Sequence, residues 1–377
     1  MQKIYLDNAA TSFPKPPSVL EAINEYFSDI GASPSRGNYS LGLLANREIF
    51  NARELLSKFF NCDNSANVIF TMNITHALNL VLFSTLNAGD HVITSGLEHN
   101  SVARPLEALK NNSGIKYTIV NPSDEGFVDP YDIKKAITPK TRMIALTHAS
   151  NVFGTVQPAQ EIGEIAHEYN LLYLLDTAQT AGFLPIDMKA LHINYLAFTG
   201  HKSLLGPPGI GGVCLDSKAT KQIRFGPLGG TGSKSHLLTQ PIDLPDRLEA
   251  GTPNTPGIMG LKASIDFILE TGIEVIRDHK VRLLNNFLAG CKELNKVKLY
   301  CANDIKRQTA CISLNIQNLD GGHLSYILDK NYGIMTRSGL HCSPLAHQSI
   351  GTFPEGTVRF SFGWFNTEDE VSATLNA

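Results

Sequence analysis

The stretch Ala197-Phe198-Thr199-Gly200-His201-Lys202 is the most informative part of this 377-residue chain. Its first half suits a buried strand, and it ends on a lysine. A glycine-rich segment, Gly206-Pro207-Pro208-Gly209-Ile210-Gly211-Gly212, follows almost at once. The pattern predicts a strand that places one lysine at the edge of a sheet, beside a tightly turning backbone. A solvated surface lysine is the alternative interpretation, because most lysines are exposed.

Short β-rich segments alternate with amphipathic segments around this stretch. The alternation predicts an α/β fold with a mainly parallel, helix-covered sheet of seven strands. Residues 142–148 and 171–176 are nearly continuous apolar runs, as expected for central strands buried on both faces. Residues 159–169 between them have helical spacing. The predicted strands of this sheet are 68–71, 91–95, 116–120, 142–148, 171–176, 195–200 and 210–215.

A second, smaller domain is expected after a long loop. Residues 226–257 are rich in Gly, Pro, Ser and Thr and have no sustained period, which predicts an ordered loop. Helical patterns over 257–294 lead into another group of predicted strands, 297–300, 310–316, 334–338 and 357–362. We therefore expect a large domain over 15–256 and a smaller α+β domain formed by 1–14 plus 257–377.

Composition favours a small-molecule substrate. The formal net charge is -3 and there is no basic stripe, so nucleic acid is not an expected partner. No apolar run approaches the length of a membrane span. Asp7 and Asn8 lie where a signal peptide would need an apolar core, and we therefore expect a cytoplasmic location.

The cysteines show neither a Cys-x-x-Cys pair nor a Cys/His cluster, so we expect no metal site and no disulfide framework. Each one can be interpreted as a small buried hydrophobe, but Cys342 fits this least, because its neighbours are Gly, His, Ser and Pro. The six are Cys62, Cys214, Cys291, Cys301, Cys311 and Cys342.

Polar residues follow two neighbouring predicted strands. Asp176 ends the run 171–176, Gln179 comes three residues later, and Lys202 follows one connecting unit further on. An enzyme that uses pyridoxal 5'-phosphate (PLP) needs such a lysine to bind the aldehyde as a Schiff base and to accept the substrate's Cα proton. A carboxylate can pair with the protonated pyridine nitrogen, and an amide can bond the phenolic oxygen. An aspartate that caps the next helix is the alternative.

Three further strand ends carry candidate residues. Residues 68–71 lead into a helix start at Ile74 and Thr75, whose free amides and hydroxyl would suit a phosphate, although N-capping by Thr75 is the alternative. His99 follows strand 91–95 and is placed to lie over a cofactor ring, although a lone loop histidine is more often polar surface. Asn151 follows strand 142–148 in the same way.

Taken in order, these residues resemble the class V aminotransferases, the PLP fold-type I group that includes cysteine desulfurases and selenocysteine lyases. The resemblance extends from Tyr5-Leu6-Asp7-Asn8-Ala9-Ala10-Thr11 to Val358-Arg359-Phe360-Ser361 and so covers nearly the whole chain. It rests on Thr75, His99, Asn151, Asp176 with Gln179, and Thr199-Gly200-His201-Lys202.

The resemblance implies a role for each of these residues. Lys202 would form the Schiff base, Asp176 would bind the pyridine nitrogen, Gln179 the phenolic oxygen, and His99 would stack over the ring, with Asn151 assisting nearby. The phosphate would be bound by the Ile74 and Thr75 amides, the Thr199 hydroxyl, His201, and Thr252 reaching in from the other subunit. A homodimer with shared sites is therefore expected.

The segment Thr336-Arg337-Ser338-Gly339-Leu340-His341-Cys342-Ser343-Pro344 resembles the Arg-x-Gly-x-His-Cys segment of the second group of cysteine desulfurases and selenocysteine lyases. In that group the cysteine takes sulfur from the substrate as a persulfide. Arg337 and His341 would favour the Cys342 thiolate. Arg359 matches the arginine that binds the substrate carboxylate, a pairing that a planar guanidinium suits.

The chain departs from the family pattern at two places. Where the family commonly reads Asn-x-His-Arg-Gly, this chain has Ser33-Pro34-Ser35-Arg36-Gly37, which keeps Arg36 as a candidate substrate-binding residue but lacks the histidine. Leu340 stands where a second histidine is frequent. The preference for the substrate's side chain and the persulfide acceptor are therefore left open.

The implied activity is that of a PLP-dependent cysteine desulfurase, which converts L-cysteine to L-alanine, forms a persulfide on Cys342 and passes the sulfur to an acceptor protein. His99 would carry a proton. Selenocysteine lyase activity is the nearest alternative, with Cys342 as a gate. Transamination would give Cys342 no role, and the joint presence of Lys202, Asp176 and Arg359 speaks against a catalytically silent scaffold. The sequence does not distinguish cysteine from selenocysteine as the physiological substrate.

Overall fold

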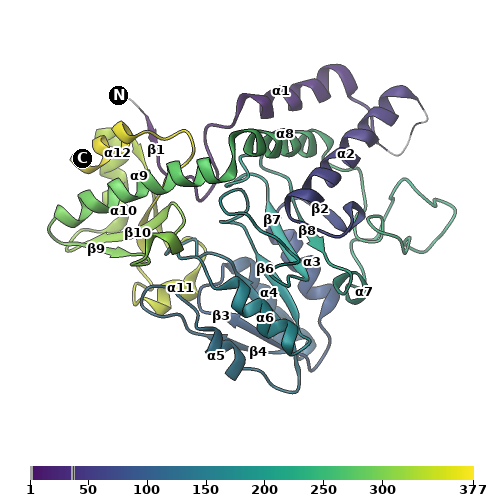
Figure 1. The fold of residues 1–377 in the computed structure, drawn as a ribbon, viewed down its shortest axis with the longest axis horizontal. Coiled ribbons are helices and arrows are strands. Elements are labelled where there is room, and N and C mark those ends of the chain that lie inside the picture. The colour runs from purple at the N-terminus through teal and green to yellow at the C-terminus, as the bar shows by residue number, and fades with distance from the viewer. Residues whose placement is uncertain (1–2, 35–36, 38) are drawn as a thin grey trace.

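The protein is described here from a computed structural model, which describes residues 3–34, 37 and 39–377. A seven-stranded sheet forms the centre of its larger part (Figure 1). Across the sheet the strands are β2 (Val68–Thr71), β8 (Gly211–Leu215), β7 (Tyr195–Thr199), β6 (Leu172–Asp176), β5 (Thr141–Thr147), β3 (His91–Ser95) and β4 (Lys116–Val120). The strands from β7 to β4 are parallel, and β8 runs antiparallel to both of its neighbours. The predicted α/β fold with a mainly parallel seven-stranded sheet is confirmed.

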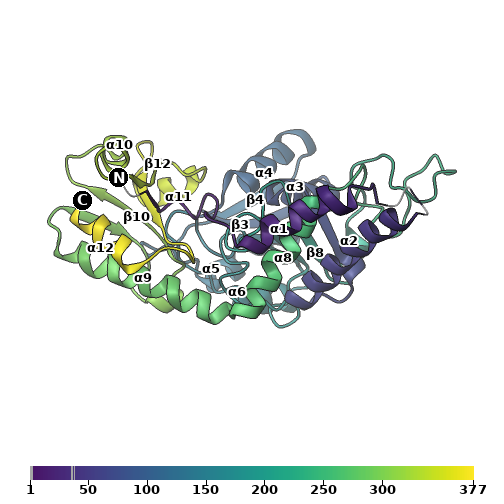
Figure 2. The ribbon, with the colours of Figure 1, turned by 90° about the horizontal axis from the view of Figure 1, so that it is seen from above.

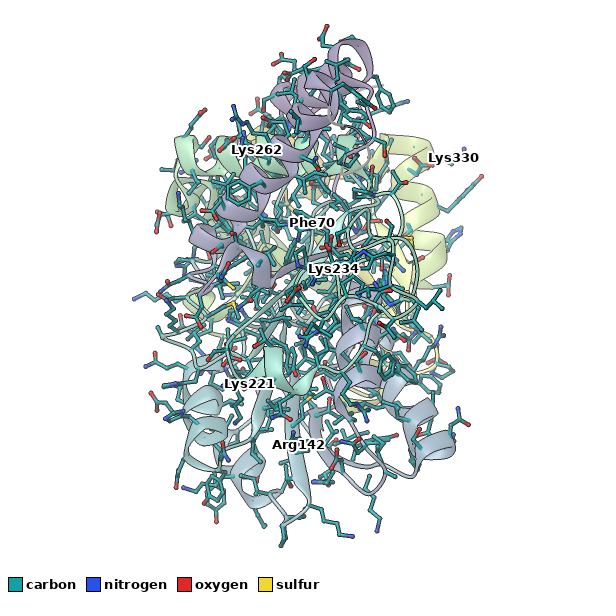
Figure 3. The ribbon with its side chains drawn as sticks, turned by 90° about the vertical axis from the view of Figure 1, so that its right-hand side faces the viewer. Phe70, Arg142, Lys221, Lys234, Lys262 and Lys330 are labelled. Carbon is teal, nitrogen blue, oxygen red and sulfur yellow. The ribbon has the colours of Figure 1, made fainter. Side chains whose placement is uncertain are left out.

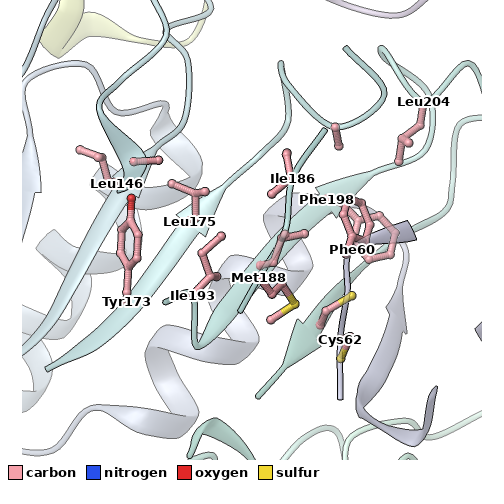
Figure 4. Packing of buried hydrophobic residues seen from close by; sticks show 14 of the residues in the cluster. Phe60, Cys62, Leu146, Tyr173, Leu175, Ile186, Met188, Ile193, Phe198 and Leu204 are labelled. Atoms are coloured by element: carbon pink, nitrogen blue, oxygen red, sulfur yellow. The ribbon is translucent and has the colours of Figure 1, made fainter. Parts of the chain in front are cut away.

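Side chains of this sheet alternate between two apolar layers, because successive residues of a strand point to opposite faces. Leu196 and Phe198 of β7 lie in one layer, whereas Tyr195 and Ala197 lie in the other. Figure 4 shows the first layer from close by, with Phe198 packed against Phe60 at a ring distance of 5.5 Å. Both faces of the sheet are therefore shielded from water, and this is why its central strands are continuous apolar runs.

Helices cover both faces of the sheet. The layer that contains Phe198 is covered by α2 (Ser40–Phe59), α6 (Ala159–Glu168) and α8 (Thr255–Thr271), and a buried residue of α5 (Pro130–Lys135) joins it. The opposite layer is covered by α3 (Ile74–Thr85) and α4 (Asn100–Ser113), with a contribution from α7 (Ala219–Gln222). Helix α1 (Pro17–Glu25) continues into a π-helical turn (Tyr26–Ile30) and packs on α8.

A second sheet lies at the other end of the molecule (Figure 2). It is antiparallel, and its strands are β12 (Arg337–Gly339), β13 (Thr357–Ser361), β10 (Cys311–Ile316) and β9 (Val297–Tyr300). The helices of this part are α9 (Ile273–Glu293), α10 (Gly321–Tyr332), α11 (Pro344–Ser349) and α12 (Glu368–Asn376). Short 3-10 turns occur at Ser65–Asn67 and Ile305–Arg307. The domain limits proposed from the sequence stay a prediction.

The predicted single strand 334–338 is wrong. The chain forms β11 (Ile334–Met335), which pairs in parallel with β1 (Ile4–Tyr5), and then β12, which pairs with β13. The change of partner occurs at Thr336, whose hydroxyl donates to Ser325 Oγ at 3.1 Å. The single stretch 334–338 therefore contributes strands to two different sheets.

The amino-terminal segment is bound to strands from the far end of the chain. Beyond β1, Asp7 forms an isolated bridge with Ser361, and the Asn8 side chain bonds to Ser361 O at 3.0 Å and Asn366 Oδ1 at 3.1 Å. Strand β1 and the carboxyl end of the chain consequently both lie in the smaller part of the molecule (Figure 1).

The helical stretch predicted over 257–294 is divided in two. Gly272, with φ of 92°, separates α8 from α9 and caps the start of the second helix. Because few side chains tolerate this backbone region, a glycine here allows the chain to turn between the helices. Helix α9 then runs from the large sheet to the smaller one (Figure 2).

The long loop predicted after residue 226 is present as irregular backbone between α7 and α8, and it projects at the right of Figure 1. Figure 3 looks onto that side, where Lys234 and Phe70 are labelled. Glu249 fixes the returning end of the loop, since its carboxylate accepts from Phe70 N at 2.6 Å and pairs with Arg53 at 2.6 Å. Among the described residues, no helix combines the length and the apolar character needed to cross a membrane.

Candidate active site

The carboxyl ends of β2, β3, β5, β6 and β7 meet at one edge of the large sheet, because β8 runs in the opposite direction to its neighbours. A pocket of about 290 Å³ lies at this edge, where open α/β sheets usually bind ligands. It brings together most of the residues predicted from the sequence. They are Ile74, Thr75, His99, Asn151, Asp176, Gln179, Thr199, His201, Lys202 and Arg359.

Lys202 follows β7 in a tight turn in which Gly206 N donates to Gly200 O at 2.8 Å. Its amine forms no ion pair in the described part of the chain. Burial lowers the pKa of Lys202 to about 8, although the charge of Asp176 opposes the shift. An amine that can lose its proton near neutral pH is suited to act as a nucleophile and as a base.

Asp176 ends β6 and is buried. Its Oδ1 accepts from Ala178 N at 2.9 Å within a turn, and the carboxyl group lines the pocket. The capping alternative is wrong, because no helix follows between β6 and β7. Burial raises the pKa of Asp176, while the Ala178 amide and the Lys202 charge act in the opposite direction. Gln179 Nε2 donates to Ala9 O at 3.1 Å, which fixes the amide against the amino-terminal segment.

Helix α3 begins at the pocket, and Asn73 rather than Thr75 is its N-cap, because Asn73 Oδ1 accepts from His76 N at 3.0 Å. The amides of Ile74 and Thr75 belong to the first turn and have no acceptor within the helix. Thr199 Oγ1 is buried without a hydrogen-bond partner among the described residues. These unpaired donors, at the positive end of a helix dipole, fit the phosphate group of PLP.

His99 is itself the N-cap of α4, and its Nδ1 accepts from Ser101 N at 3.1 Å. Burial, together with the charges of Lys202 and Arg337, lowers the pKa of His99 to about 4, so the imidazole is neutral at pH 7. Burial likewise lowers the pKa of His201 to about 4. Neutral rings can accept or donate a hydrogen bond without adding charge to the site.

Ser101 is a pocket residue that sequence analysis missed. Its hydroxyl lies 2.6 Å from His99 Nδ1 and 2.9 Å from Thr75 Oγ1, and thereby joins the starts of α3 and α4. Its place two residues after His99 was the available signal. Asn73 and Thr147 also line the pocket and were not predicted.

Cys342 lies beside the pocket, in a turn after β12. All six cysteines are free, and Cys342 is the exposed one. His341 and Cys342 both have left-handed backbone, with φ of 49° and 61°, a conformation that costs roughly 1 kcal/mol or more for each non-glycine residue. Such strain persists only where neighbouring contacts hold the turn in place.

Three hydrogen bonds hold this turn. Asn100 N donates to Cys342 O at 2.8 Å, and Asn151 Nδ2 donates to His341 O at 2.7 Å. Ser343 Oγ in turn donates to Asn151 Oδ1 at 2.6 Å. Asn151 also lines the pocket, so the expected role of its amide near the cofactor ring and the substrate stays a prediction.

Arg337 is the cation next to the cysteine, since its Nη2 lies 3.4 Å from Cys342 Sγ. The charge expected from His341 is absent, because burial and the nearby Arg359 lower the pKa of His341 to about 2. Of the two charges predicted beside the cysteine, the structure therefore keeps that of Arg337.

Arg337 and Arg359 face each other across β12 and β13, and both line the pocket. Arg359 Nη2 pairs with Asp7 Oδ1 at 2.6 Å, whereas its buried Nε has no partner among the described residues. Like charges opposite each other in a sheet are unfavourable. An anion such as a carboxylate between the two guanidinium groups would relieve this repulsion.

Two of the predicted residues that the structure describes, Thr252 and Cys342, do not line this pocket. Thr252 lines a separate pocket together with Met72 and His76, on the outer side of the α3 start. Arg36 lies outside the described residues. In the described part of the chain no cluster of three or more His, Cys, Asp or Glu residues is arranged to hold a metal ion.

The fold and the pocket together define a class of protein. The family model for class-V aminotransferases matches residues 4–374, and the chain belongs to this family. Class V aminotransferases and cysteine desulfurases are PLP-dependent as groups. The predicted resemblance is therefore confirmed.

Individual relatives of the chain within this family are named as probable cysteine desulfurases. The chain is 36% identical to a probable cysteine desulfurase of Methanothermobacter thermautotrophicus, over 98% of this chain and 92% of the relative. A probable cysteine desulfurase of Pyrococcus abyssi is 33% identical over 99% and 92%.

Solved structures of cysteine desulfurases are similar throughout. The apo enzyme of Thermococcus onnurineus NA1 has a TM-score of 0.92 at 32% identity and covers 99% of this chain and 93% of its own. The CsdA enzyme of Escherichia coli, in an S-sulfonic acid form, has a TM-score of 0.89 at 26% identity with the same coverage. The predicted PLP fold-type I architecture is confirmed.

Proposed function

We propose that this protein is a PLP-dependent cysteine desulfurase that converts L-cysteine to L-alanine and collects the sulfur on Cys342. One observation carries the proposal. An exposed thiol, 3.4 Å from the Arg337 guanidinium, lies at the side of a pocket that contains Lys202 and Asp176. The probable cysteine desulfurases that match nearly the whole chain support it.

The pocket residues fit the cofactor. Lys202 would hold PLP covalently, Asp176 would bind its ring nitrogen, Gln179 its phenolic oxygen, and His99 would lie against the ring. The Ile74 and Thr75 amides, Thr199 and His201 would hold the phosphate. When bound, PLP supplies an aldehyde that takes up amino groups and a ring that accepts the electrons of a Cα carbanion.

Lys202 is the base for the substrate's Cα proton. Its pKa of about 8 leaves a useful fraction of neutral amine at physiological pH. Asp176 must stay ionised beside it. Burial raises the pKa of Asp176, and the Ala178 amide and the Lys202 charge oppose that shift by favouring the carboxylate. His99, neutral and held by Ser101, is the candidate carrier of the proton that Cβ of the product receives.

Arg359 and Arg337 are the binding residues for the substrate carboxylate. They approach the pocket from neighbouring strands, and Arg359 Nε is left without a partner among the described residues. Arg36, which lies outside the described residues, is a further proposed contact. A site with two guanidinium groups fixes the orientation of a bound amino acid.

The Cys342 thiolate performs the sulfur transfer. Its sulfur forms a bond to the substrate sulfur, the bond between Cβ and that sulfur breaks, and the electron pair of the broken bond remains on the carbon side. A proton added at Cβ and a proton returned to Cα then complete alanine, and Cys342 keeps the extra sulfur as a persulfide. Exposure of Cys342 leaves the persulfide accessible to a thiol of an acceptor protein.

The decisive experiment compares Cys342→Ser with Cys301→Ser, a change at a partly buried thiol outside the site. With L-cysteine, Cys342→Ser should keep bound cofactor and lose alanine formation by at least ~100-fold, because a serine hydroxyl is not ionised at neutral pH. Cys301→Ser should keep full activity. Full cysteine activity in Cys342→Ser would overturn the mechanism and favour transamination.

Selenocysteine lyase activity is the second candidate. Cys342 is placed beside the pocket rather than in its lining, which suits a gate as well as a nucleophile. Because selenium leaves carbon more readily than sulfur does, selenocysteine turnover that survives Cys342→Ser, while cysteine turnover is lost, would identify this function.

We further propose a homodimer in which Thr252 reaches the phosphate of the partner's site. The support is that Thr252 lies outside the pocket of its own chain, on a segment fixed by the ion pair of Glu249 with Arg53. We also propose a cytoplasmic location. Six free thiols, one of them exposed, suit a reducing compartment.

A further inference from the structure

A second, much smaller cavity lies behind the active-site pocket, between the large sheet and the smaller one. Its volume is about 20 Å³. It shares Ala9 and Gln179 with the active-site pocket, so the Gln179 side chain stands between the two spaces. The remaining lining residues are Asn8, Phe183, Ser203, Lys280, Thr309, Ala310, Cys311, Ser361 and Phe362.

Lys280 brings a buried positive charge to this cavity from α9. Its side chain is 6% exposed, and its Nζ lies 3.4 Å from Ser203 Oγ and 5.0 Å from the centre of the Phe183 ring. No carboxylate lies within ion-pairing distance of it in the described part of the chain. A buried ammonium without a counter-charge is costly, so this arrangement calls for a compensating anion.

Nearby groups do not provide that negative charge. Burial raises the pKa of the Cys311 thiol to about 11, so the thiol is neutral at physiological pH. Burial lowers the pKa of Lys280 to about 8, which leaves most of the amine protonated at pH 7. The cavity therefore has a net positive character.

Two hydroxyl groups that line the cavity can each donate a hydrogen bond for which the described residues provide no acceptor. Thr309 Oγ1 is buried and has no hydrogen-bond partner among the described residues. Ser203 Oγ accepts from Lys280, and its own proton is free to be donated. An ammonium and two hydroxyl groups around one small space form a donor set that suits an anion.

We propose that this cavity binds one monatomic monovalent anion of the halide class, held by Lys280, Ser203 and Thr309. A space of about 20 Å³ holds roughly one water-sized sphere, which suits a monatomic anion better than sulfate or phosphate. The bound anion would join α9 to the turn that follows Lys202, because Ser203 is the next residue. The site does not depend on the reaction that the enzyme catalyses.

Diffraction gives the direct test. Crystals of the holoenzyme grown in sodium gluconate and soaked in sodium bromide should show an anomalous bromide peak within hydrogen-bond distance of Lys280 Nζ. Bromide that appears only at surface residues, with the cavity holding water, would overturn the proposal. This measurement uses the unaltered protein and so does not rely on a variant that folds.

A solution test uses variants. Sodium chloride should raise the Tm of the wild type above its value in sodium gluconate of equal ionic strength, by roughly 1–3 °C. Lys280→Met should abolish this difference, and Thr309→Val should reduce it, while Lys262→Met should retain it. Lys262 is a suitable control because it is a partly exposed lysine on α8 whose ammonium already has Asp266 as partner (Figure 3). An equal chloride effect in Lys280→Met would contradict the proposal.

Discussion

The protonation state of Glu98 depends strongly on the residues around it. Its Oε1 accepts from Ser95 Oγ at 2.6 Å and from Thr147 N at 3.0 Å, whereas its Oε2 has no partner among the described residues. Burial raises the pKa of Glu98 to about 8, even though the two hydrogen bonds act in the opposite direction. Glu98 is therefore a neutral acid at pH 7, immediately before His99.

This predicts a pH dependence of stability. In the unfolded chain Glu98 has its usual pKa near 4.5, so between that pH and about 8 the folded state binds more protons than the unfolded state. The stabilising contribution is complete below pH 4.5 and is lost as pH rises through about 8. Glu98→Gln, which is neutral at every pH, should flatten this part of the stability curve measured by urea unfolding.

A surface variant provides the control for Glu98. Glu164 is exposed on α6, and Glu164→Gln should leave the pH dependence of the wild type unchanged. If Glu98→Gln and the wild type lose stability in parallel between pH 5 and 8, the neutral state of Glu98 is wrong.

Lys202 carries a second prediction at this scale. The purified protein should be yellow, and borohydride reduction followed by peptide mapping should place the label on the peptide that contains Lys202. Lys202→Ala should remove the visible absorption band. Lys280, a buried lysine whose pKa burial likewise lowers to about 8, is the informative comparison, because label on its peptide would contradict the assignment.

The residues that sequence analysis found and missed differ in a physical way. Lys202 and Asp176 are charged groups next to apolar runs, and that contrast is visible in the sequence. Ser101 is an ordinary helix-start serine until the fold brings Thr75 to within 2.9 Å of it. Its role depends on a contact between two helices, which the sequence pattern does not contain.

At the scale of elements, the turn after β6 is pressed against the turn that carries Lys202. Gly182 has φ of 82°, and a Cβ there would lie 2.4 Å from Ser203 O. Gly89 has a similar φ of 85°, but a Cβ there would meet nothing within 4 Å. The two glycines therefore share the backbone requirement and differ in the space around them.

This pair separates backbone strain from steric contact. Gly89→Ala should reduce the free energy of unfolding by about 1 kcal/mol, the usual cost of a positive φ without glycine. Gly182→Ala should cost clearly more, about 3 kcal/mol or above, and should also weaken cofactor retention, because the Lys202 turn must move. Urea unfolding and the visible absorption after dialysis measure both effects. Equal losses for the two variants would show that the turns are not in contact.

The limits of a strand could be predicted where the residues of the strand itself determine them. Strands β2, β3, β4 and β9 have the predicted limits, because each is a short apolar or β-branched run with clear ends. The division at Thr336 was not predictable, since it depends on which partner, Ile4 or Arg359, lies beside each half. Pairing between strands that are far apart in the sequence leaves no signal in the residues near Thr336.

At the scale of the whole molecule, the proposed homodimer predicts complementation. A Thr252→Ala subunit with intact Lys202 is mixed with a Lys202→Ala subunit with intact Thr252. Each heterodimer should contain one complete site, so activity should recover well above that of either variant alone. Heterodimers that are shown to have formed but have no recovered activity would argue against a shared site.

The binding of the amino-terminal segment has a consequence for how the protein is made. Ala9 and Ala10 line the pocket, and they are held there by Asp7, whose partner Arg359 lies 352 positions later in the sequence. A ribosome produces the first of these residues long before the last, and long-range pairing is slow to form. The large sheet can fold on the nascent chain, but the pocket closes only after the segment that contains Arg359 has been made. Loading of the cofactor should therefore follow the synthesis of that segment.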